Sequence, residues 1–248
     1  IVMAGFSQAS SLEVVAPDYP DTTFVIIDGV VDAPNVRSVI FREEQGSYLV
    51  GMLAALASES GTVGFIGGMD IPLIRNFACG YAQGVMAVNP DAKIVANMTG
   101  TTPSAWNDPV KGAELAKAQK SQGADVIYAA AGGTGIGVLQ AAADEGILSI
   151  GVDSNQNYLH PGQVLTSMTK RVDNAVYDIF KEGPDMTPGI LVMDLKAGGV
   201  DYALDDNNKD LVTVEMKTKV DEAKAKIEAG EITVHDYMSD ETCPALSF

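Results

Sequence analysis

Basic residues, aromatic residues and long apolar runs are all scarce in this chain of 248 residues. It holds 16 lysines and arginines against 33 aspartates and glutamates, a formal net charge of −17. A surface of this sign repels phosphate backbones, so nucleic acids and anionic membranes are poor partners. The longest apolar run, residues 47–57, is too short to span a bilayer and is expected to form a buried helix. A small, neutral or weakly charged ligand fits this composition better.

Cysteine and histidine are also rare, with two of each. Cys79, Cys243, His160 and His235 show no metal-ligand spacing, so no metal site is expected. Cys79 lies within a helical pattern and Cys243 lies in the tail. Two buried thiols are the favoured expectation, and a disulfide between them stays open.

Apolar strand-like runs alternate with helical patterns over most of the chain. This alternation predicts an α/β fold whose parallel sheets are covered by helices on both faces. Asp108 before Pro109 is the expected cap and first residue of a helix. The expected strands are 1–5, 24–28, 37–41, 61–68, 93–98, 125–131, 148–152 and 164–168, and the expected helices are 46–58, 73–88, 109–122, 135–146 and 171–182.

The order of these segments predicts two Rossmann-like lobes with a ligand cleft. Lobe 2, residues 60–170, holds five strands and three helices, enough for one doubly wound unit. Lobe 1, residues 1–59 plus about 171–190, looks underbuilt and is expected to lack its N-terminal strands. Residues 191–248 hold crossing strands and a charged C-terminal helix, and their lobe is left open.

The glycine-rich segment YAAAGGTGIGVLQAA, residues 128–142, resembles a dinucleotide-binding loop at first sight. A buried strand precedes it, and Asp153 follows the next strand, as in a Rossmann fingerprint. If Gly133 and Gly135 are the first two glycines, however, the third position is Val138, where close helix packing needs glycine or alanine. A turn that exposes backbone N–H groups is therefore the preferred interpretation. A Rossmann-type nucleotide-dependent enzyme remains the alternative.

Notable residues follow the predicted strands at their carboxyl ends, where open α/β sheets bind ligands. Asp28 ends one strand, Gly132 and Asp153 follow two others, and Lys170 comes just after a fourth. Trp106, the single tryptophan, lies in a loop after another strand. Stacking on a ligand ring and packing at the hinge are its two expected roles.

No catalytic arrangement is predicted. Glu43 and Glu44 are adjacent, so their side chains point apart and cannot readily share a proton. Phe77 and Tyr81, four residues apart on one helix, are expected in the core. The serines and histidines show no nucleophile–base pattern, so we expect a protein that is not an enzyme and has no cofactor.

Residues 61–95, GTVGFIGGMDIPLIRNFACGYAQGVMAVNPDAKIV, resemble the basic membrane protein (BMP) family of ABC-transporter substrate-binding lipoproteins, which capture purine nucleosides. The resemblance continues in the same order over nearly all of the chain. It implies the periplasmic-binding-protein type I fold, with two lobes, three crossings and closure on the ligand. The other similar segments are FREEQGSYLVGMLAALAS, WNDPVKGAELAKAQKSQGADVIYAAAGGTGIGV, GVDSNQNY, VLTSMTKRVDNAV and AKIEAGEITV.

The resemblance also implies roles for the strand-end residues. Asp28 is similar to the family's aspartate on the cleft wall, and Asp153 to the acid that accepts hydrogen bonds from the ribose hydroxyls. Lys170 is similar to the lysine that reaches the same sugar. Gly132 and Gly133 resemble the strand-end turn near the ligand.

Two departures from the family follow from the same comparison. The family usually places an aromatic residue near that turn to stack on the base, whereas residues 129–131 are alanines. Tyr128 or Trp106 is expected to take its place. Family members also begin with a strand and a loop similar to D-x-x-F-N, so this sequence is expected to lack a leader and the first part of lobe 1.

The implied function is that of an extracytoplasmic substrate-binding protein of an ABC importer, periplasmic or lipid-anchored. It would bind a purine nucleoside, or a similar small polar ring compound, between its lobes. Its partners would be this ligand and a membrane permease, and a monomer is expected. The alternatives are the nucleotide-dependent enzyme and the ligand-sensing domain of a regulator.

Overall fold

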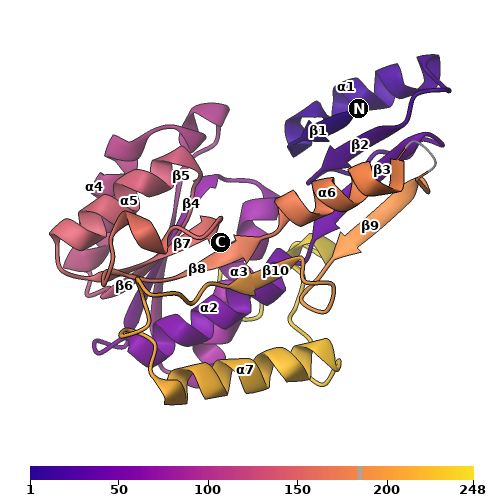
Figure 1. The fold of residues 1–248 in the computed structure, drawn as a ribbon. Helices are drawn as coiled ribbons and strands as arrows, with labels where there is room; N and C mark the ends of the chain where they lie inside the picture. The colour runs from indigo at the N-terminus through magenta and orange to yellow at the C-terminus, as the bar shows by residue number, and fades with distance from the viewer. Residues whose placement is uncertain (184–185) are drawn as a thin grey trace. The chain divides into compact units, whose positions relative to one another are not determined.

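The chain forms an α/β fold with two sheets in a computed structural model that describes residues 1–183 and 186–248 (Figure 1). It divides into two compact units, residues 1–42 with 171–200 and residues 43–170 with 201–248. The chain therefore passes from one unit to the other at three places, after residues 42, 170 and 200. The predicted fold class is confirmed.

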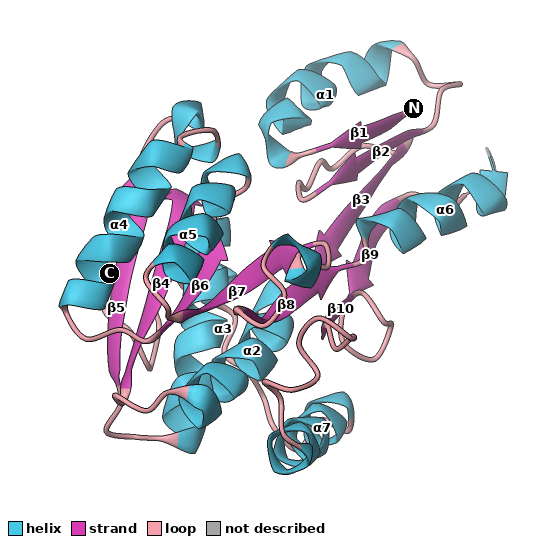
Figure 2. Cartoon of the chain, turned by 60° about the vertical axis from the view of Figure 1, so that its left-hand side comes forward, coloured by secondary structure: helices cyan, strands magenta, loops and turns pink. Residues whose placement is uncertain are grey.

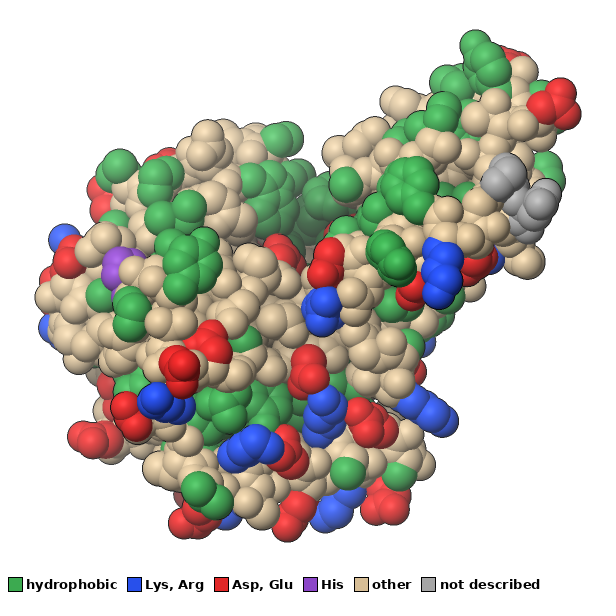
Figure 3. All heavy atoms as spheres, in the orientation of Figure 1, with side chains coloured by type: hydrophobic (Ala, Val, Ile, Leu, Met, Phe, Trp, Pro, Cys, Tyr) green, Lys and Arg blue, Asp and Glu red, His purple; other side chains and the backbone are tan. Residues whose placement is uncertain are grey.

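Unit 1 is built on a parallel sheet of order β1-β2-β3-β9. Strand β2 is buried along its whole length, as its unbroken apolar sequence predicts. Helix α6 buries Ala175 and Ile179 and leaves Tyr177 and Phe180 exposed. Hydrophobic side chains, drawn in green, lie on the surface over this helix (Figure 3). The elements of unit 1 are β1 (Val2–Ala4), α1 (Ala9–Val15), β2 (Phe24–Ile27), β3 (Val36–Phe41), α6 (Val172–Glu182) and β9 (Gly189–Met193).

Unit 2 is built on a sheet of order β10-β8-β7-β6-β4-β5. Strands β4 to β8 are parallel to one another and follow the 2-1-3-4-5 order of a doubly wound sheet. The five strands expected between residues 61 and 168 are therefore confirmed. They are β4 (Thr62–Met69), β5 (Lys93–Gly100), β6 (Val126–Ala130), β7 (Leu148–Asp153) and β8 (Val164–Lys170), followed later by β10 (Val200–Tyr202).

Helices cover both faces of the unit 2 sheet (Figure 2). α4 (Pro109–Ser121) and α5 (Gly133–Asp144) pack together on one face, and α2 (Glu43–Ala57) and α3 (Pro72–Val88) pack together on the other. α7 (Val214–Glu228) lies along α2. The predicted cap of α4 is confirmed, because the Asp108 carboxylate accepts a hydrogen bond from the Lys111 N–H at 2.9 Å.

The placement of α2 differs from the sequence-based division, which grouped residues 43–59 with lobe 1. α2 packs instead along α3, within unit 2. The two backbones touch at Gly84, where a Cβ atom would collide with the carbonyl oxygen of Tyr48. This close approach buries Leu49 and Leu53 completely, as expected for the apolar run. No helix among the described residues has the length and apolar character needed to cross a bilayer.

The C-terminal segment returns along α3 and carries a disulfide between Cys79 and Cys243, with a Cα–Cα distance of 5.7 Å. The expectation of two buried thiols is wrong. The Gln83 side-chain amide donates to the His235 carbonyl at 3.0 Å and accepts from the His235 N–H at 2.8 Å. The Asn76 side chain accepts from the Tyr237 N–H at 2.9 Å. These bonds bring the tail alongside Cys79, a long-range proximity that spacing does not reveal.

Candidate functional site

The carboxyl ends of the parallel strands of unit 2 meet along one edge of its sheet. β4 has β5 on one side and β6 on the other, so the strand order reverses between β4 and β6. Helices leave this point toward opposite faces of the sheet, and folds of this kind bind ligands at such a switch point. The candidate site therefore lies at the ends of β4, β6 and β7.

The indole ring of Trp106 lies at this switch point. It belongs to the short turn η3 (Pro103–Trp106) that follows β5, and it is partly exposed. A Cβ atom at Gly68 would collide with the ring, and one at Gly132 would lie 3.5 Å from Cε3. The ring thus contacts the ends of β4 and β6 because neither position carries a side chain.

Hydrogen bonds hold the Trp106 turn in place. The hydroxyl groups of Thr99 and Thr134 donate to the Ala105 carbonyl at 2.9 and 2.8 Å. The Asp108 N–H in turn donates to the Thr134 hydroxyl at 2.7 Å. The aromatic ring is therefore fixed to both β5 and α5.

Gly132 and Gly133 form the predicted strand-end turn. Gly132 has a φ of 56°, in the region that favours glycine, and α5 begins at Gly133. The first N–H groups of a helix have no partner within the helix, so this end attracts electronegative ligand atoms. Val138, the residue that broke the dinucleotide fingerprint, is fully buried in the core.

Asp153 and Asp28 share an uncommon backbone conformation. Asp153 ends β7 with a φ of 65° and is exposed, and Asp28 follows β2 in unit 1 with a φ of 63° and is half-buried. Among the described residues, the only other non-glycine residue with a positive φ is Glu241. This conformation costs roughly 1–2 kcal/mol and tends to persist at functional sites. Both predicted ligand aspartates therefore stand at strand ends in a conformation that aspartate tolerates.

Lys170 ends β8 and forms a buried ion pair. Its Nζ lies 3.0 Å from Oε1 of Glu43, and the two side chains are only 4 % and 3 % exposed. The ammonium also lies 5.8 Å from the centre of the Phe77 ring. Lys170 therefore stands at a strand end as predicted, with one of its three donors directed at a carboxylate, and its contact with the sugar stays a prediction.

Tyr128 is fully buried in the middle of β6. Its ring packs against Phe65 at 5.5 Å and Tyr81 at 5.4 Å, and its hydroxyl lies 3.4 Å from the Ser47 hydroxyl. Because the Tyr128 ring has no exposed face, it does not fit the predicted role of stacking on the ligand base. Trp106 is the aromatic residue that the structure places at the sheet edge. The expectation that Tyr81 belongs to the core is confirmed, and so is that for Phe77, which is 3 % exposed.

Glu44 is a buried acid whose environment the sequence did not reveal. It is 2 % exposed, and its Oε2 accepts a hydrogen bond from the Asn76 side chain at 3.0 Å. Burial raises the pKa of Glu44 to about 8, against the opposing effect of the Asn76 hydrogen bond. Glu43 faces Lys170 while Glu44 faces Asn76, so the predicted divergence of these neighbours is confirmed.

The stability of the fold is expected to fall with rising pH because of Glu44. The folded protein keeps a proton up to about pH 8, whereas the unfolded chain loses it near 4.5. The contribution of the protonated Glu44 carboxyl to the free energy of unfolding is therefore complete below pH 4.5 and is lost as the pH rises to about 8. Urea unfolding of the wild type and of Glu44→Gln should diverge by on the order of 1 kcal/mol per pH unit between about pH 5 and pH 7.5. Parallel pH profiles of the two proteins would refute this assignment.

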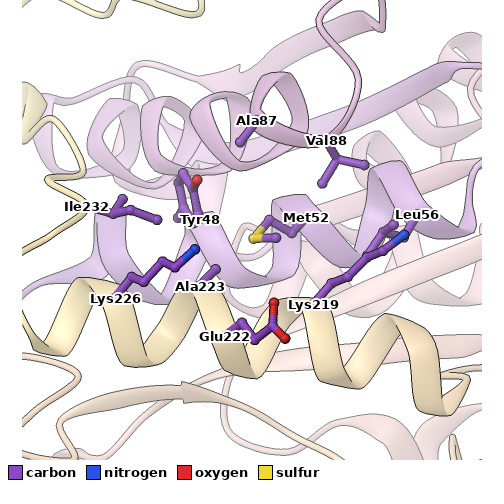
Figure 4. Close-up of a pocket in the computed structure, with 10 residues that line it drawn as sticks. All are labelled: Tyr48, Met52, Leu56, Ala87, Val88, Lys219, Glu222, Ala223, Lys226 and Ile232. Carbon is purple, nitrogen blue, oxygen red and sulfur yellow. The ribbon is translucent and has the colours of Figure 1, made fainter.

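A hollow of about 390 Å³ lies between α2, α3 and α7 (Figure 4). Tyr48, Met52 and Ala223 contribute to its apolar lining, and Lys219 and Lys226 reach over it from α7. None of the predicted ligand residues lines it. No group of three or more histidine, cysteine, aspartate or glutamate side chains suited to a metal ion occurs within residues 1–183 and 186–248.

Comparison with known proteins identifies the family of the chain. The model of the family described as "Bmp: ABC transporter substrate-binding protein PnrA-like" matches residues 1–236. The ABC transporter nucleoside-binding protein BmpA of Lactococcus lactis is 36 % identical, over 93 % of this chain and 69 % of its own length. Basic membrane protein D of Borreliella burgdorferi is 33 % identical, over 83 % of this chain and 62 % of its own.

Solved structures show the same fold. An ABC transporter solute-binding protein from Aeropyrum pernix K1 superposes with a TM-score of 0.83 at 29 % identity, covering 94 % of this chain and 76 % of that one. A transcriptional activator of the comK gene from Bacillus halodurans superposes with a TM-score of 0.80 at 26 % identity, covering 98 % and 80 %. The chain belongs to the Bmp family of PnrA-like ABC-transporter substrate-binding proteins and has the periplasmic-binding-protein type I fold.

Proposed function

We propose that this chain binds a purine nucleoside, or a similar polar ring compound, and presents it unchanged to an ABC permease in the membrane. One observation carries the proposal: a partly exposed indole, Trp106, and an exposed strand-end carboxylate, Asp153, stand on the same sheet edge. The ends of β4 and β7 are two strand spacings apart, or about 10 Å. That is close to the length of a base joined to its sugar.

Each group suits one part of such a ligand. The indole offers a flat apolar face to a base, while the N–H groups at the start of α5 meet its electronegative atoms. The Asp153 carboxylate accepts charge-assisted hydrogen bonds from two sugar hydroxyls. Asp28, at the end of β2 in unit 1, stays a predicted ligand residue. The strongly acidic chain favours an uncharged nucleoside over a nucleotide.

The relatives support this choice over its alternatives. The Lactococcus protein is named as nucleoside-binding, and the matching family is one of substrate-binding proteins. This class favours a solute receptor over a regulator or a Rossmann-type enzyme. The Cys79–Cys243 disulfide suits an oxidising, extracytoplasmic compartment, where we propose that the protein acts as a lipid-anchored or periplasmic monomer.

Calorimetry of the Asp153→Ala variant tests the site. Titration with guanosine, inosine, adenosine and cytidine should show tighter binding of the purine nucleosides, and the substitution should weaken their binding by roughly tenfold or more. Asp91→Ala is the matched control, because Asp91 is exposed just before β5, at the opposite edge of the sheet.

Unchanged affinity in Asp153→Ala would remove that residue from the site. The absence of binding by any nucleoside, together with no purine absorbance in the supernatant of the denatured protein, would refute the nucleoside proposal.

A further inference from the structure

The turn that follows Asp153 is held by a second aspartate, Asp205. One oxygen of the Asp205 carboxylate accepts from the side-chain amides of Asn155 at 2.6 Å and Asn157 at 3.2 Å. Its other oxygen accepts from the Asn207 N–H at 2.6 Å. Asp205 thus joins two loops that are about fifty residues apart in the sequence.

The same turn is hydrogen-bonded to the strands beside it. The Gln156 side chain accepts from the Val152 N–H at 2.9 Å, directly before Asp153. The Gln156 N–H donates to the Ser167 hydroxyl at 2.9 Å, and that hydroxyl donates to the Asn157 side chain at 2.8 Å. Ser167 and Asn157 are fully buried. The end of β7 therefore rests on an ordered polar network rather than on a free loop.

Asp205 is itself anchored to β8 through Asn208. The Asn208 side chain, only 1 % exposed, donates to the carbonyls of Leu165 at 2.8 Å and Ala203 at 3.0 Å and accepts from the Asp205 N–H at 2.8 Å. The hydrogen bond from Asn155 lowers the pKa of the Asp205 carboxyl, so the group is ionised and acts only as an acceptor at neutral pH. A fixed anion with fixed donors is suited to setting the position of a loop.

We propose that Asp205 is a positioning residue for ligand binding: through Asn155 and Asn157 it fixes the turn that keeps Asp153 in its left-handed conformation at the sheet edge. Asp205 does not itself contact the ligand. The reason is geometric, because an exposed aspartate with a φ of 65° relaxes to the extended region unless its neighbours determine its backbone. This inference rests on the function proposed above. It names the residues that hold Asp153, the proposed ligand-binding acid, in position.

A double-mutant cycle on nucleoside affinity tests the inference. Asp205→Ala should weaken guanosine binding roughly three- to tenfold in the wild-type background. In the Asp153→Ala background the same substitution should have almost no further effect, because the group that it positions is gone. A structural role alone would weaken binding by the same factor in both backgrounds. Asp206→Ala is the control, since the Asp206 side chain is 95 % exposed and pairs with Lys209.

Asn155→Ala provides an independent route should Asp205→Ala fold poorly. It removes the 2.6 Å bond to Asp205, together with the bond that the Asn155 side-chain oxygen accepts from the Asn157 N–H at 3.0 Å, and leaves the Asn157 and Asn207 bonds to Asp205 in place. It should show the same dependence on Asp153. Equal losses in both backgrounds, or no loss in either, overturn the positioning role while leaving the nucleoside site intact. If Asp153→Ala by itself leaves the affinity unchanged, Asp153 is not part of the site, and if no nucleoside binds the wild type, the proposed function is refuted, so the failures are distinguishable.

Discussion

Replacing Lys170 by methionine is expected to lower the free energy of unfolding by roughly 3–5 kcal/mol. The substitution leaves the carboxylate of Glu43, which is 3 % exposed, without the cation that lies 3.0 Å away. An enclosed charge that loses its partner keeps its full desolvation cost. Urea unfolding at neutral pH measures the loss.

Two comparisons isolate the effect of burial. The double variant Glu43→Leu with Lys170→Met should recover most of the lost stability, because apolar replacement of a buried pair is often nearly neutral. Lys120→Met breaks a surface pair whose side chains are 38 % and 35 % exposed, and it should cost less than about 1 kcal/mol. Similar losses for Lys170→Met and Lys120→Met would contradict this account.

Removal of the disulfide with Cys79→Ala and Cys243→Ala is expected to cost about 2–5 kcal/mol. The bridge spans 164 residues, and cross-links restrict the unfolded chain more as the closed loop grows longer. Alanine avoids placing a hydroxyl at position 79, which is fully buried. Thermal unfolding with and without reductant measures the same difference in the wild type.

The tail provides a control for this experiment. Gln83→Ala removes the two hydrogen bonds to His235 but keeps the bridge, so it should cost less, about 1–3 kcal/mol. Limited proteolysis should release residues 231–248 sooner from the reduced wild type than from Gln83→Ala. An unfolding temperature that does not change on reduction would show that the bridge adds no stability.

The fold was predictable because its signals are local. The strands of unit 2 are runs of apolar residues that need burial on both faces, and Pro72 and Asp108 mark helix starts by backbone chemistry alone. The strand-end positions of Asp28, Asp153 and the Gly132 turn follow directly from that pattern.

The features that the sequence left open depend on contacts between distant segments. Glu43 meets Lys170, and Cys79 meets Cys243, across more than a hundred residues.

Other features could have been predicted from local signals. The burial of Tyr128 is one, because the residue lies in the middle of an unbroken apolar run. The spacing of Gly80 and Gly84 was likewise a signal that α3 packs closely on another helix, which is the contact that places α2 in unit 2.

The length of chain between the two bridged cysteines also fixes an order of events during biosynthesis. α2 and α3 are neighbours in sequence and can pair as soon as both have been synthesised, whereas the bridge must wait for Cys243, which lies 164 positions after Cys79. Oxidation therefore comes late in maturation, after the helix that carries Cys79 has formed. A chain interrupted before residue 243 would leave a single thiol on that helix, with no cysteine to pair with it.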